Sequence, residues 1–107
     1  MIESIKRSGW DPIPRDGVVG VTGNVLLIRE GLLIAHLKFE EHATIDEHSA
    51  PYEIDVICLA GRGHMSIGNQ RFEFKQDERA VWPRGIDHRL WTEDTTMETL
   101  MVERYES

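Results

Sequence analysis

Short runs of β-branched and aromatic residues recur along the whole chain, with turn residues between them, and this recurrence most constrains the fold. No long stretch has an apolar period of three to four residues bounded by helix caps. The pairs Glu30-Gly31 and Gly68-Asn69 fall between adjacent runs, as short hairpin turns do. The pattern predicts an all-β chain with strands at residues 18–21, 25–29, 32–39, 53–60, 64–67, 71–75, 79–82, 87–91 and 97–104.

So many short strands leave many edges, which proteins protect by closing the sheet into a barrel or by packing two sheets as a jelly roll. A chain of 107 residues is expected to form one domain around one core. We expect residues 1–24 to form an extended N-terminal arm and a first strand, and residues 25–104 to form the barrel. The arm is extended at Pro12 and Pro14 because proline disfavours helix.

The charge balance excludes some partners. Twelve lysines and arginines against nineteen acidic residues give a net charge of −7, which repels nucleic-acid phosphates and anionic membranes. Cys58 is the single cysteine, so the chain has no disulfide framework and no cysteine zinc cluster. No apolar run approaches the roughly 20 residues of a membrane helix, and the N-terminus lacks an apolar signal core. We therefore expect a cytoplasmic protein.

A positioned histidine motif lies near the end of the chain. Pro83-x-Gly85-x2-His88 follows Val81-Trp82 and precedes another β-rich run. This motif resembles the second motif of the cupin superfamily, G-x5-P-x-G-x2-H-x3-N. Asp77 stands at the opening glycine and Thr92 at the closing asparagine. Aspartate tolerates positive φ better than most residues, so the opening turn is expected to survive.

The first cupin motif, G-x5-H-x-H-x3,4-E-x6-G, matches the segment from Ile45 to Gly61 in two ways. One alignment places Asp46, His48 and Glu53 at the two histidine positions and the glutamate position. The other is gapless and makes His48 the first histidine, with Ala50 and Ile54 at the remaining positions.

The two alignments predict opposite faces for neighbouring residues. Glu53 and Ile54 cannot both face the interior of a regular strand, because successive side chains alternate between its faces. A β-bulge near Pro51 would rescue the first alignment. The face shared by Ile54, Val56, Cys58 and Ala60 is wholly apolar, which favours the second.

The resemblance implies a small β-barrel with a metal site inside, in a homodimer whose N-terminal strands pack across subunits. Its candidate ligands here are His48, His88, Glu53 and Asp46, which suit one divalent ion of Mn, Fe, Ni, Cu or Zn. The N-terminal segment is loosely similar to small cupins that act on unsaturated uronate sugars.

Three further residues are candidates for substrate binding: His36, His64 and Tyr52. Each has a simpler structural interpretation, as a hydrogen-bonded or exposed side chain. No catalytic residue is assigned. A Ser49-His48-Asp46 relay is excluded, because adjacent residues of a strand point to opposite faces.

Two functions remain open at this point. The first is a metal-binding cupin that presents a small polar organic substrate, such as a sugar acid, to a divalent metal, as an isomerase or lyase or as a dioxygenase. The second is a non-catalytic cupin whose metal site is degenerate and whose cavity binds a small molecule. Fold analogy cannot choose between them.

Overall fold

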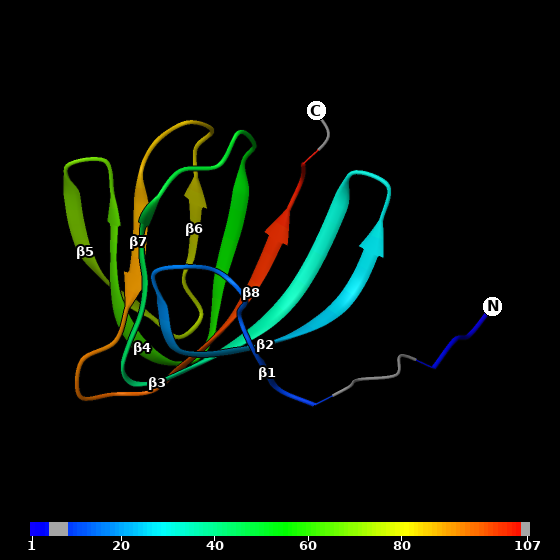
Figure 1. Ribbon diagram of the computed structural model, residues 1–107, viewed down its shortest axis with the longest axis horizontal. Helices are drawn as coiled ribbons and strands as arrows, with labels where there is room; N and C mark the ends of the chain where they lie inside the picture. The colour runs from blue at the N-terminus through cyan, green and yellow to red at the C-terminus, as the bar shows by residue number, and fades with distance from the viewer. Residues whose placement is uncertain (5–8, 106–107) are drawn as a thin grey trace.

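The computed structural model describes residues 1–4 and 9–105, which form strands and loops (Figure 1). No helix occurs in this part of the chain, and hence none that could cross a membrane. The all-β prediction is confirmed. The eight strands are β1 (Asp11–Pro12), β2 (Val18–Arg29), β3 (Leu32–His48), β4 (Ile54–Ile67), β5 (Gln70–Lys75), β6 (Arg79–Trp82), β7 (His88–Trp91) and β8 (Met97–Glu103).

Two of the predicted breaks between strands are absent from the structure. The glycines at these places do not form turns, but lie inside a continuous strand where another part of the chain approaches closely. β2 runs through Gly23, and β4 runs through Gly61 and Gly63. A Cβ atom on Gly23 would lie 2.7 Å from Ile13 Cδ1, and one on Gly63 would lie 2.5 Å from the Trp91 carbonyl oxygen. Glycine inside a strand often marks such an approach. The hairpin turns at Glu30-Gly31 and Gly68-Asn69 are present as predicted.

The long strands β3 and β4 each contribute to both sides of the barrel. Residues 33–39 of β3 pair with β8, whereas residues 44–48 pair with β7. Likewise, β4 pairs with β8 and β6 along its first half, and with β5 and β7 along its second half. Figure 1 shows the result, with β5 and β7 on one side and β8 with the β2–β3 hairpin on the other.

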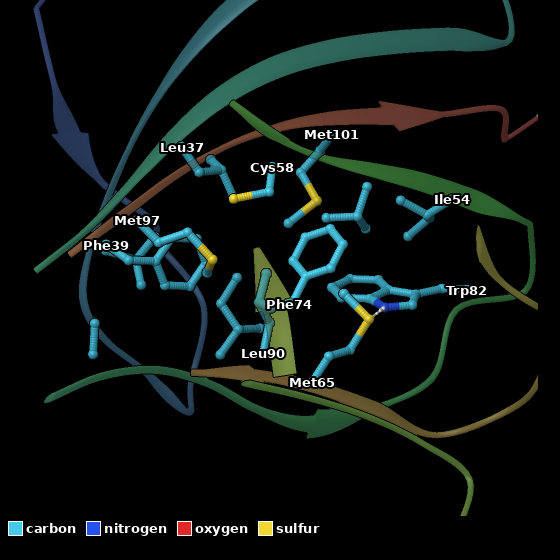
Figure 2. Close-up of a cluster of buried hydrophobic side chains, with 14 of the residues drawn as sticks. Leu37, Phe39, Ile54, Cys58, Met65, Phe74, Trp82, Leu90, Met97 and Met101 are labelled. Carbon is cyan, nitrogen blue, oxygen red and sulfur yellow. Dashed lines mark hydrogen bonds between the residues drawn. The ribbon is translucent and has the colours of Figure 1, made fainter. Parts of the chain in front are cut away.

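Alternation along the strands places the core between these two sides. In β4 the inward side chains Ile54, Val56 and Cys58 are each at most 5% exposed. Figure 2 shows Ile54 and Cys58 with Phe74 of β5 and with Trp82, which pairs with Ile54 across β6 and β4. Burial raises the pKa of the Cys58 thiol, so the cysteine is a small apolar core residue, as the sequence indicates.

Both departures from the second cupin motif are accommodated. Asp77 has a φ of 71°, so this residue does take the left-handed conformation expected of the glycine it replaces. Thr92 is buried, and its hydroxyl accepts the Ala43 N–H at 3.0 Å and donates to the Glu40 carbonyl. Thr92 therefore joins β7 to the bend of β3.

Gly61 is the tightest position in the bend of β4. Its φ is +72°, and a Cβ atom there would lie 2.1 Å from the Thr96 carbonyl oxygen. Gly85 has a similar φ of +73°, but a Cβ atom there would meet nothing within 4 Å. The two positions separate the cost of a steric clash from the cost of backbone conformation.

We therefore predict that Gly61→Ala lowers the free energy of unfolding by about 3 kcal/mol or more, because conformational strain and a backbone clash add. Gly85→Ala is the matched control and should cost about 1 kcal/mol, from conformation alone. Urea denaturation of both variants measures the difference. Equal losses would show that the close approach at Thr96 does not hold the bend.

Candidate histidine site and barrel cavity

A bulge in β3 brings His48 into the barrel. Ile45 pairs with Leu90 and His48 with His88, so two residues of β3, Asp46 and Glu47, lie opposite one residue of β7, Arg89. The extra residue reverses the alternation, and His48 faces inward although it lies three positions after the inward Ile45. The bulge lies before Pro51, not near it as the first alignment required.

His88 lies opposite His48 on β7 and is 1% exposed. Its ring stacks on the Trp82 indole, with centroids 3.8 Å apart and planes 13° from parallel. The indole is itself held by a hydrogen bond from Nε1 to Met65 Sδ at 3.2 Å, drawn in Figure 2. Burial first, and His48 second, lower the pKa of His88 to about 4. His88 is therefore neutral at neutral pH.

The hydrogen bonds assign the protons of both rings. His48 Nδ1 lies 2.9 Å from the carbonyl oxygen of Asp46, which can only accept, so Nδ1 carries the hydrogen and Nε2 has the lone pair. His88 Nε2 lies 3.2 Å from that Nε2 and therefore donates to it. His88 Nδ1 is left as a buried acceptor without a hydrogen bond. The Ile86 backbone opposes the shift and raises the pKa of His88, but by less than burial and His48 lower it.

The N-terminal arm adds a cation to this pair. Arg15 Nη1 donates to His48 Nε2 at 3.0 Å. The arm is fixed upstream of Arg15, where β1 pairs with β2 and the Asn24 side chain donates to the Gly9 carbonyl at 2.8 Å. Arg15 follows the two prolines that keep this arm extended.

His48 and Arg15 border a cavity of about 200 Å³ inside the barrel. A cavity of this size is smaller than the clefts of roughly 300–1,000 Å³ that hold drug-sized ligands. Glu103 is its third polar residue. The remaining lining is apolar and consists of Ile13, Val18, Val25, Leu33, Ala35, Leu37, Ile45, Ile54, Trp82 and Met101.

A second depression of about 350 Å³ shares Arg15, His48, Ile54 and Glu103 with this cavity, and therefore adjoins it. Tyr52 lies there and donates its hydroxyl to Glu103 Oε1 at 2.9 Å. Burial, followed by this hydrogen bond to the carboxylate, raises the pKa of Tyr52. Of the three substrate-binding candidates, Tyr52 is thus the one beside the cavity.

The two carboxylates of the first alignment do not reach the histidine pair. Glu53 is exposed and lies 3.7 Å from Arg104. Asp46, in the bulge, accepts from the Thr44 hydroxyl at 2.9 Å and lies 3.8 Å from Arg89. The buried inward residue is Ile54, so the structure follows the second alignment, and the ligand set with Asp46 and Glu53 is not assembled.

His36 and His64 also lie away from the histidine pair. His36 contacts Glu98 at 2.9 Å and packs edge-on against Trp10. His64 contacts Glu93 at 2.8 Å and stacks on Trp91. Neither histidine lines the barrel cavity, and their contacts are those of the simpler structural interpretation.

The histidine pair fits two positions around a metal ion and no more. Two nitrogens at about 2.0–2.1 Å from one tetrahedral ion lie about 3.3 Å apart, close to the 3.2 Å between the two Nε2 atoms. Catalytic zinc sites, however, use three protein ligands. Across residues 1–4 and 9–105, no group of three or more His, Cys, Asp or Glu side chains is arranged to hold a metal. The donor set does not complete a resident metal site.

Arg15, Trp82 and Glu103 are site residues that the sequence did not single out for this role. The motif spacing locates His48 and His88, but nothing in the sequence shows where an extended arm crosses the barrel. The one available signal for Arg15 is its place directly after Pro12-Ile13-Pro14, a segment that cannot continue as helix.

Solved structures resemble the chain closely in fold. The polyketide cyclase RemF from Streptomyces resistomycificus aligns with a TM-score of 0.84 and 17% identity, over 99% of this chain and 81% of that one. A predicted oxalate decarboxylase from Thermotoga maritima gives 0.81 and 21%, over 91% and 92%. A cupin 2 conserved barrel domain protein from Leptotrichia buccalis gives 0.74 and 25%, over 78% of this chain and 40% of that one. No protein-family model and no curated protein matches the chain.

These likenesses and the two-sided barrel define the class of protein. The chain has the cupin fold, a jelly-roll β-barrel, and the resemblance expected from Pro83-x-Gly85-x2-His88 is confirmed. At this level of identity the comparisons establish the fold and leave the reaction open.

The lowered pKa of His88 predicts a specific loss of stability in acid for the metal-free protein. An unfolded histidine binds a proton near pH 6.5, whereas folded His88 does so only near pH 4. Between these values the unfolded state binds more protons, so stability falls as pH falls from 6.5 to 4, by about 3 kcal/mol from this group.

Urea denaturation across this pH range, in the presence of EDTA, tests the prediction. His88→Gln should remove this part of the pH dependence, whereas His42→Gln, at an exposed position, should retain it. NMR titration of the His88 ring in the wild-type protein measures the pKa without a substitution. A value near 6.5 would contradict the burial argument.

Proposed function

We propose that the protein binds a small organic molecule in the barrel cavity, with the polar end of that molecule against Arg15 and His48. The observation that carries the proposal is a largely apolar cavity bordered by Arg15 and His48, whose side chains contact each other. His88 contacts His48 from behind the cavity wall. Ligand pockets generally combine an apolar lining with a few convergent polar groups. This is the non-catalytic alternative of the sequence analysis, with Arg15 added to its site.

The residues at the missing ligand positions support a site without a resident metal. Ile54 lies in the cavity where the second alignment has the motif glutamate, and Ala50 stands at the second histidine. Both side chains pack with the core. They offer no atom that could bind an ion, but they extend the apolar surface available to an organic ligand.

The apolar lining also bears on the kind of ligand. A sugar acid, expected from the sequence, presents several hydroxyl groups that need hydrogen-bond partners when buried. Ten of the thirteen cavity residues are apolar and offer no such partners from their side chains. A molecule with an apolar body suits this lining better. The neighbours include a polyketide cyclase and a predicted oxalate decarboxylase, so the shared fold favours neither reaction for this chain.

Binding in the cavity can be tested with a fragment library and ¹H–¹⁵N NMR spectra of the whole chain in EDTA. We expect some fragments to shift the amide signals of Val25, Leu33 and Ile54, which line the cavity. Ala35→Leu places three further carbons in this space and should weaken such binding at least about tenfold.

Gln70→Leu, at an exposed position of β5, adds a leucine outside the cavity and is the matched control. Its fragment affinities should equal those of the wild-type protein. If no fragment shifts cavity signals, or if Ala35→Leu binds as well as the control, ligand binding in the cavity is wrong.

Metal content supplies an independent test. Elemental analysis of the purified, untagged protein should find well below one metal atom per chain, because the histidine pair has no third ligand among residues 1–4 and 9–105. The single variants His48→Ala and His88→Ala should each have the same metal content as the wild-type protein. One tightly held equivalent that both variants lose would instead support the metal-binding function expected from the sequence.

A further inference from the structure

The cluster formed by Arg15, His48 and His88 has more hydrogen-bond donors than acceptors. Arg15 Nη1 and His88 Nε2 both point at His48 Nε2, at 3.0 and 3.2 Å. A neutral imidazole nitrogen has one lone pair, so the two donors compete for a single acceptor. A donor that is only partly satisfied here would gain from an additional oxygen acceptor.

The carboxylates nearby do not supply that acceptor. Within the described chain, Arg15 forms no ion pair, since the seven ion pairs involve other cations. Glu103 borders the same cavity, but its Oε1 already accepts the Tyr52 hydroxyl and it is not within ion-pair distance of Arg15. The positive charge at the cavity therefore faces a neutral ring.

The two histidine rings supply one acceptor to this cluster. His48 Nδ1 donates to the Asp46 carbonyl, which leaves Nε2 as the acceptor of that ring. His88 Nδ1 is buried and forms no hydrogen bond. Two donors, the Arg15 guanidinium and the His88 Nε2–H, are thus directed at one acceptor, and of the two donor residues Arg15 borders the cavity.

We propose that the ligand of this cavity is a carboxylic acid with a small apolar body, its carboxylate bound by the Arg15 guanidinium and its body in the cavity. This inference rests on the proposed function and specifies its ligand class. Planar carboxylates match the guanidinium fork and form charge-assisted hydrogen bonds. The remainder of the ligand contacts the apolar lining formed by Leu33, Ile54 and Met101 among others.

Isothermal titration calorimetry with straight-chain acids from butanoate to octanoate tests the ligand class. Each acid is compared with its primary amide, which has the same body and no charge. We expect the acids to bind about ten- to a hundredfold more tightly than the amides, as expected for a hydrogen bond to a charged group. Inorganic phosphate, an anion without an apolar body, should bind more weakly than either series.

Arg15→Gln should remove the preference for acids while leaving amide affinity unchanged, and Arg15→Lys should retain part of it because the charge remains. Arg29→Gln is the control, since it removes the same charge at an exposed position outside the cavity. Thermal unfolding of each variant verifies the fold.

The possible results distinguish the inference of a carboxylate ligand from the proposal that the cavity binds a ligand at all. If acids and amides bind equally, or if Arg15→Gln keeps the preference for acids, the carboxylate inference is wrong and cavity binding stands. If neither series binds and Ala35→Leu changes nothing, the proposed function itself fails. Acid binding that disappears in EDTA would also overturn the inference, because a metal ion and not Arg15 would then hold the carboxylate.

Discussion

The bulge at Asp46 and Glu47 is the constraint on which the site depends. Without the additional residue, the alternation of β3 would direct His48 outward and Glu47 inward. The bulge keeps Ile45 and His48 both inside, opposite Leu90 and His88 of β7. One extra residue in one strand thus brings together two histidines that are 40 positions apart in the sequence.

The orientation of the two rings then follows from their surroundings. The Asp46 carbonyl, which belongs to the bulge itself, fixes the hydrogen of His48 on Nδ1. Trp82 stacks on His88, and burial keeps that ring neutral. The same bulge therefore sets the position of His48, its tautomer and the direction of its lone pair. Arg15 and His88 converge on that lone pair as a consequence.

Much of the fold could be predicted from the sequence, because its signals are local. Alternating apolar residues and the glycine turns at Gly31 and Gly68 predict the strands and hairpins, and the spacing from Pro83 to His88 indicates the cupin class. Glycines inside strands are different. Gly23 and Gly63 permit contacts with Ile13 and Trp91, which are remote in sequence, and no local pattern distinguishes such a glycine from a turn.

The site was predictable only in part, for the same reason. His48 and His88 lie in motifs, whereas Asp46 and Glu53 were candidates because spacing alone cannot locate a bulge. The all-apolar face of Ile54, Val56 and Cys58 did favour the correct alignment. Three apolar side chains on one face indicate which face of the strand is buried. They are stronger evidence for the alignment than one carboxylate at a permitted spacing.

Arg15 makes the N-terminal arm part of the site, and contacts from Gly9 to Pro12 hold the arm against the barrel. Trp10 packs edge-on against His36, and Lys38 Nζ lies 4.2 Å from the centroid of the Trp10 ring. β1 pairs with Gly23 and Thr22, and Asn24 binds the Gly9 carbonyl. These contacts lie on the strands β2 and β3, which also line the cavity. The conformational cost of placing the guanidinium is thus met on folding, so Arg15 is a preorganised cation for the ligand that we propose.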